Sequence, residues 1–309
     1  MVAQNATIYK EDYNTIQTQI SDLLGTGSYD SGYGQSVTSI PVATGTLISA
    51  QSAANQWISL YNDMKKVADH QGTDIGTLTT AYTANVKTGS IIQAADINKF
   101  SDTIGTLVAN KLVAGDLALA TTAGAGIDGS RTATWGGQVG PAIVRHIFTV
   151  TFTDNNALRA YFNSGGSIKF AASISSNTPD QNTDWYNLLT SMQTITYSQL
   201  GARSSGNTGN PTNFRPYDLS SQQTIYSKGG GGSFSQYAAN FYAIRASRSN
   251  NVLTFEVVFE DDHTNAGNWY DYVTGTLTST ITYQKPNGTY ISIPTPTFAR
   301  QRDLSSDAG

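Results

Sequence analysis

The first third of the chain carries apolar residues at helical spacing. In the first such segment they recur at steps of three and four, and Gly25 stands where a helix cap is expected. The three apolar series are Tyr9, Tyr13, Ile16, Ile20 and Leu23; Trp57, Leu60, Tyr61, Met64, Val67 and Ala68; and Ile97, Phe100, Ile104, Leu107 and Val108. We therefore predict a helical N-terminal region over residues 1–113, whose amphipathic helices serve docking and assembly.

A stretch rich in Gly, Ala and Thr, 114–142, has no helical periodicity, and the pattern after it has a period of two. Apolar and polar residues alternate as in antiparallel strands that bury one face, through 148–153, 168–175, 253–259 and 277–283. We predict a linker over 114–142 and an antiparallel β-sandwich over 143–309. The expected fold class is α+β, with N-terminal amphipathic helices followed by an antiparallel β-sandwich that has one inserted helix.

Local patterns add detail to the sandwich. Residues 157–175 are interpreted as two short β-forming runs hinged at Asn163-Ser-Gly-Gly166. Residues 182–192 have a helical pattern with an early Asp, and they supply the inserted helix. Lys-Pro-Asn-Gly at 285–288 is predicted to join the last two strands.

Composition narrows the possible functions. Only 13% of residues are charged, the net charge is −4, and no segment gathers the 18 Lys and Arg residues, so we expect no nucleic-acid partner. The absence of cysteine excludes disulfides, thiolate catalysis and Cys-based metal sites. No stretch of about 18 apolar residues exists, and the N-terminal residues lack a secretory pattern, so membrane insertion is not expected.

Few side chains could do chemistry. The three histidines are His70, His146 and His263. His70 is predicted to end a helix, where a positive charge is favourable. One acidic cluster could offer oxygen ligands to a cation such as calcium, and it comprises Glu260, Asp261, Asp262 and Asp271. It lacks ordered Asp-x-Asp-x-Asp-Gly spacing, so a solvated turn is the favoured interpretation and no cofactor or metal is expected.

Glycoside hydrolysis is the enzymatic reaction for which the carboxylates have to be considered. Glu256 and Glu260 lie on one face of a predicted strand, about 13 Å apart at the backbone. That mechanism needs two carboxyl groups about 5–10 Å apart, so we expect a protein that is not an enzyme. A cell-wall hydrolase using Glu256, Glu260 or Asp262 is kept as a third function class.

Six segments together resemble virion structural proteins of tailed bacteriophages, especially those of cyanobacteria. They include HIFTVTFTDNNALRAYFNSGGSIKFAASIS (146–175) and TGTLTSTITYQKPNGTYISIPTPTF (274–298), together with 13–37, 53–72, 182–192 and 253–265. The resemblance implies a component of the neck, tail, baseplate or fibre, found in the virion and, before assembly, in the host cytoplasm. Its partners would be copies of itself and other virion proteins. The resemblance supplies no catalytic residue.

Such a protein would act through its interfaces, in which aromatic residues anchor the contact. Seven aromatic residues in predicted loops are candidate anchors, although each could instead pack onto its own domain: Tyr29, Tyr33, Trp135, Tyr217, Tyr226, Phe234 and Tyr237. The alternative function is a carbohydrate-binding adhesin or receptor-binding module on the virion. In that case Trp269 and Tyr270 would stack on a glycan of the host surface.

Overall fold

The computed structural model describes residues 9–43, 50–86, 92–111, 127–136, 141–230, 234–262, 272–286 and 288–301. The chain forms two compact units. Unit 1 comprises Met1–Ala120, Asp154–Gly165 and Lys285–Pro294, and unit 2 comprises Thr121–Thr153, Gly166–Gln284 and Thr295–Gly309. The predicted division at 113 and 143 therefore differs from the observed one, because two short segments of the second half pack into the helical unit.

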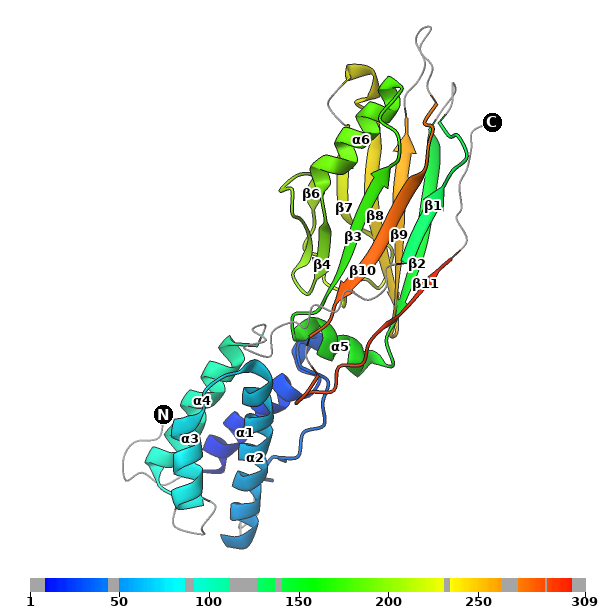
Figure 1. The fold of residues 1–309 in the computed structure, drawn as a ribbon. Coiled ribbons are helices and arrows are strands. Elements are labelled where there is room, and N and C mark those ends of the chain that lie inside the picture. The colour runs from blue at the N-terminus through cyan, green and yellow to red at the C-terminus, as the bar shows by residue number, and fades with distance from the viewer. Residues whose placement is uncertain are drawn as a thin grey trace. The chain divides into compact units, whose positions relative to one another are not determined.

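Among its described residues, unit 1 contains five α-helices (Figure 1). They are α1 (Lys10–Leu24), α2 (Ala50–Gln71), α3 (Gly76–Ala81), α4 (Ala94–Ala109) and α5 (Asn155–Asn163). The predicted apolar stripes form its core, since Ile20, Met64 and Phe100 are fully buried. The prediction of amphipathic N-terminal helices is confirmed.

The predicted hairpin at 157–175 is wrong, because its first half is helix α5. Asp154 caps this helix by accepting a hydrogen bond from the Ala157 backbone at 2.7 Å. Leu158, Tyr161 and Phe162, spaced three and four residues apart, are fully buried. The capping aspartate and this spacing are the sequence signals of the helix, although the spacing by itself also fits a strand.

Unit 2 contains two antiparallel sheets. The five-stranded sheet has the order β1-β10-β3-β4-β5, and the six-stranded sheet has the order β11-β2-β9-β8-β7-β6. The strands are β1 (Ile127–Arg131), β2 (Ala142–Thr151), β3 (Ser167–Ile174), β4 (Ile195–Ser198), β5 (Gly201–Ser204), β6 (Asn210–Pro211), β7 (Gln223–Gly229), β8 (Phe241–Ser249), β9 (Val252–Asp261), β10 (Leu277–Gln284) and β11 (Thr297–Arg300).

The two sheets pack face to face, which confirms the predicted sandwich. The ring of Phe255 on β9 lies 5.0 Å from Phe170 on β3, which belongs to the other sheet. His146 Nδ1 on β2 lies 2.9 Å from Ser279 Oγ on β10. Helix α6 (Asp180–Met192) is the predicted inserted helix, and in Figure 1 it lies beside β3. Its Trp185 is fully buried.

The predicted linker is wrong in detail, whereas Lys-Pro-Asn-Gly at 285–288 does lead from one to the other of the last two strands. Strand β1 falls inside the predicted linker 114–142 and pairs with β10 from Ile127↔Ile281 to Arg131↔Leu277. Lys285–Gly288 begins the connection from β10 to β11, but these strands lie in different sheets. This connection runs through Lys285–Pro294, which belongs to unit 1, and there Ile291 and Ile293 are buried. Within the described residues, no helix has the length and apolarity to cross a membrane.

Candidate protein-contact surface

Burial separates the seven candidate anchors. Four are at most 2% exposed, so their prediction as surface anchors is wrong: Tyr33, Trp135, Tyr226 and Tyr237. Tyr217 and Phe234 are half-buried. Tyr29 is 86% exposed and is the one among the seven that projects fully from the surface. The glycan candidates Trp269 and Tyr270 lie outside the described residues, so the adhesin alternative stays a prediction.

The buried aromatics pack inside their own units, and the hydroxyl groups of Tyr33 and Tyr226 find hydrogen-bond partners there. The Tyr33 hydroxyl donates a hydrogen bond to the Lys111 carbonyl and accepts one from Gln71 Nε2 at 2.9 Å. Burial raises the pKa of Tyr33, and the hydrogen bond from Gln71 opposes that rise only in part. The Tyr226 hydroxyl donates to the Thr208 carbonyl at 2.9 Å. A loop position in the sequence therefore does not imply exposure.

Tyr29 stands on an unusual turn after α1. Tyr29 and Asp30 have φ of 52° and 59°, in the left-handed region that non-glycine residues rarely adopt. Gly27 precedes them with φ of 71°, and a Cβ there would lie 2.5 Å from the Asp22 carbonyl oxygen. Two such residues in succession cost about 1–3 kcal/mol each, so the surrounding contacts must hold the turn in place.

Helix α5 supplies those contacts, and both segments belong to unit 1. Arg159 forms an ion pair with the Asp30 carboxylate, donating from Nε at 2.7 Å. The Asn163 side chain, fully buried, donates to the backbone carbonyls of Asp30 at 2.9 Å and Gly32 at 2.6 Å. Helix α5 thereby fixes the turn at the residues that follow Tyr29.

A groove of about 240 Å³ adjoins this turn. It is lined by Gln19, Asp22 and Leu23 of α1, by Ser31 of the turn, and by Val108 and Lys111 at the end of α4. Val108 is 45% exposed although it continues the apolar series of α4. We call Tyr29 and this groove the Tyr29 surface. It combines a projecting aromatic ring with a partly apolar hollow, as protein interfaces do.

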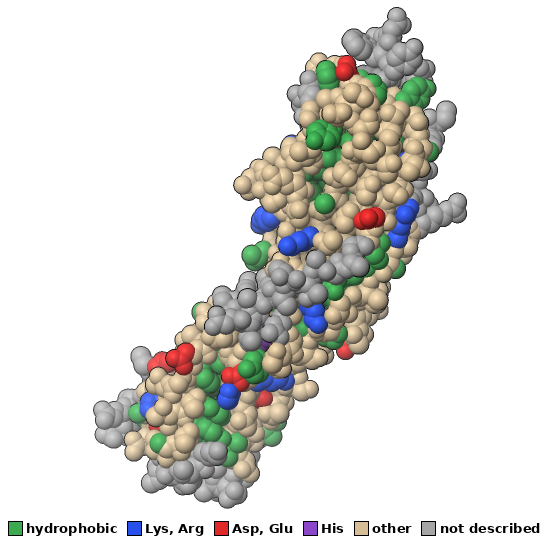
Figure 2. All heavy atoms as spheres, viewed as in Figure 1, with side chains coloured by type: hydrophobic (Ala, Val, Ile, Leu, Met, Phe, Trp, Pro, Cys, Tyr) green, Lys and Arg blue, Asp and Glu red, His purple; other side chains and the backbone are tan. Residues whose placement is uncertain are grey.

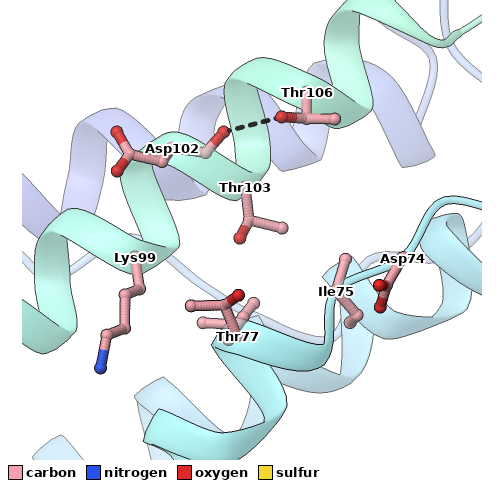
Figure 3. Close-up of a pocket in the computed structure, with 8 residues that line it drawn as sticks. Asp74, Ile75, Thr77, Lys99, Asp102, Thr103 and Thr106 are labelled. Carbon is pink, nitrogen blue, oxygen red and sulfur yellow. Dashed lines mark hydrogen bonds between the residues drawn. The ribbon is translucent and has the colours of Figure 1, made fainter.

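A second hollow, of about 300 Å³, lies between α3 and α4 (Figure 3). Thr77 and Thr103 line its middle, whereas the Asp102 carboxylate and the Lys99 ammonium group point away from it. Asp74 accepts a hydrogen bond from the Gly76 backbone at 2.8 Å, just before α3. These polar groups serve the helices that carry them, and the hollow presents no projecting apolar group.

The carboxylates singled out in the sequence lie on different sides of β9. Glu256 is on the outer face, held by Arg145 at 2.9 Å and by Gln222 at 2.8 Å. Asp261 is buried, Glu260 is half-buried and Asp262 is exposed. The solvated-turn interpretation is wrong for Glu260 and Asp261, because both lie in the strand.

His263 and Asp271 lie outside the described residues. Within the described part of the chain, no three His, Cys, Asp or Glu side chains come together as metal ligands. On the face drawn in Figure 2, charged side chains stand singly or in small mixed groups between larger uncharged areas.

Comparison of the chain with family models, curated proteins and solved structures finds no match.

Proposed function

We propose that the protein is a non-enzymatic structural component of a tailed-phage virion. It would associate with copies of itself or dock on neck, tail, baseplate or fibre proteins. The sequence resemblance supports the virion, and the Tyr29 surface supports action by protein contact. The observation that carries the second point is an almost fully exposed tyrosine on a strained turn that α5 holds in place through Asp30 and Gly32.

This arrangement suits an interface because the turn is already ordered in the free protein. Binding is weakened when side chains and loops must be ordered at the interface, and a rigid turn avoids part of that loss. Tyrosine is also among the residues that contribute most to interface affinity. The Tyr29 ring would enter a pocket of the partner, while the groove between α1 and α4 would receive an apolar side chain from it.

The experiment compares Tyr29→Ala with wild type in purified protein and in assembling particles. We expect particle assembly or self-association to fall at least about tenfold, as for an interface residue worth 1.4 kcal/mol or more. The free energy of unfolding should change by no more than about 0.5 kcal/mol, because Tyr29 makes few contacts within its unit. Electron microscopy of particles and light scattering of the purified chain provide the two readouts.

Tyr186→Ala is the matched control, since Tyr186 is 43% exposed on the regular helix α6. It should leave assembly unchanged. Normal assembly with Tyr29→Ala would contradict the proposed contact. Glycan binding that is abolished by changing Trp269 or Tyr270, without any assembly defect, would favour the adhesin alternative.

A further inference from the structure

Four polar side chains are enclosed where helix α6 meets the ends of two strands in unit 2. Gln181 and Asp184 lie on α6, Asn240 directly precedes β8, and Asp261 ends β9. All four are at most 1% exposed. We call them the α6 polar cluster. Enclosing polar groups costs free energy unless each finds a partner, so such a concentration needs a physical reason.

The helix spacing places Gln181 and Asp184 together. Residues three and four apart share a face of a helix, so Gln181 lies beside both Asp184 and Trp185. The Trp185 ring is 5.9 Å from the ring of Phe259 on β9, so this face of α6 is turned toward the six-stranded sheet. Asp184 reaches that sheet directly, because its Oδ2 lies 3.4 Å from Asn240 Nδ2.

The strand register brings Asp261 to the same place. Phe241 pairs with Glu260, so the next position along each strand sets Asn240 opposite Asp261. Side chains at opposite positions have Cβ atoms about 4.5–5.5 Å apart. Asp261 also pairs with Ala142 on its other side, and this small side chain leaves room beside the carboxylate.

Amide atoms in this cluster have no hydrogen-bond partner among the residues that the structure describes. Neither Oε1 nor Nε2 of Gln181 has a hydrogen bond there, and neither does Oδ1 of Asn240. Both side chains are fully buried, and leaving such an atom unsatisfied costs about 1–3 kcal/mol. The unpartnered amide oxygens accompany two carboxylates, which points to a ligand that binds oxygen.

We propose that the α6 polar cluster binds one divalent cation of the calcium class. Calcium takes six to eight oxygen ligands at about 2.3–2.6 Å and accepts carboxylate and amide oxygens together. The carboxylates of Asp184 and Asp261 match its charge, and the amide oxygens of Gln181 and Asn240 gain a partner. Magnesium fits less well, since it demands octahedral geometry and usually keeps several waters. The bound ion would tie α6 to the six-stranded sheet.

The test uses the full chain after treatment with a chelator and dialysis. Adding calcium chloride should raise the melting temperature by roughly 5 °C at a concentration about 100-fold above the dissociation constant. Mass spectrometry of the washed protein should find about one calcium per chain. Terbium, a calcium analogue, should luminesce when tryptophan is excited, because Trp185 adjoins Asp184 in the sequence and lies on the same face of α6 as Gln181.

Asp261→Asn and the exposed neighbour Asp262→Asn form a matched pair. Asp262→Asn should keep the calcium-dependent melting shift and the terbium signal, whereas Asp261→Asn should lose both. Asp184→Asn is the second variant, and it should behave like Asp261→Asn even if one of the two folds poorly. Absence of bound calcium and of any melting shift in the wild-type chain would overturn the proposal and leave enclosed water as the partner of these amides.

Discussion

At the scale of single residues, His70 shows how burial outweighs a favourable position on a helix. Its Nε2 lies 2.7 Å from Ser164 Oγ, and its ring meets the Tyr33 ring at 5.1 Å. Only 1% of the residue is exposed, and burial lowers the pKa of His70 to about 4. The sequence predicted a positive charge here because α2 ends nearby, but loss of hydration exceeds the attraction of the helix dipole.

The pH dependence of unit 1 follows from this histidine. Between pH 6.5 and about 4, unfolded His70 binds a proton that folded His70 does not, because its folded pKa is the lower one. The free energy of unfolding should therefore be highest above pH 6.5 and fall by roughly 3 kcal/mol as the pH drops through this window. His70→Gln, which can still bond Ser164, should lack that part of the loss in urea unfolding at pH 7 and pH 4.5. An equal loss in both proteins would assign the effect to other groups.

At the scale of elements, α5 and β1 are decided by what they pack against. The apolar residues of 157–162 suit a helix or a strand, and the Asp154 cap is a weak signal beside the strands on either side. Strand β1, Ile-Asp-Gly-Ser-Arg, has one apolar residue and no alternation. It becomes a strand because β10 offers it a complete set of backbone partners.

Two glycine-to-alanine changes test this account of the elements. At Gly129 of β1 a Cβ would lie 2.7 Å from the His146 ring, so Gly129→Ala should destabilise the sandwich by about 1–3 kcal/mol. At Gly105 of α4 a Cβ would meet nothing within 4 Å, so Gly105→Ala should stabilise the helical unit by about 0.5–1 kcal/mol. Calorimetry of the two variants should show the loss of stability for Gly129→Ala and the gain for Gly105→Ala. A harmless Gly129→Ala would show that β1 does not press against β2.

At the scale of the whole molecule, each unit depends on segments that are distant in the chain. The backbone passes between the units five times, after residues 120, 153, 165, 284 and 294. Unit 1 takes Leu158 and Phe162 from one excursion and Ile291 and Ile293 from another, all of them buried. Neither unit is a continuous stretch, which is why composition alone put the boundary at a Gly-rich linker.

Residues 1–120 expressed alone should therefore be helical but incompletely packed. The fragment lacks the buried side chains of 154–165 and 285–294, so its helices would keep exposed apolar surface. We expect a helical far-ultraviolet circular dichroism spectrum, weak near-ultraviolet signals and binding of the dye ANS, unlike the full chain. A cooperative unfolding transition of the fragment, without dye binding, would show that the two added segments are dispensable.

The sequence by itself determined the parts whose signal is local and repeated. Helical spacing identified the helices that contain Tyr13, Trp57 and Phe100, and two-residue alternation identified β2, β3, β9 and β10, because one-sided burial imposes these periods. Tertiary structure decided the rest. Tyr29 projects and Tyr33 is buried although both lie in one loop, and Asp261 is buried whereas its neighbour Asp262 is exposed. Whether a side chain is exposed, and which side chains come together, depends on residues far away in the chain. No local sequence pattern indicates either.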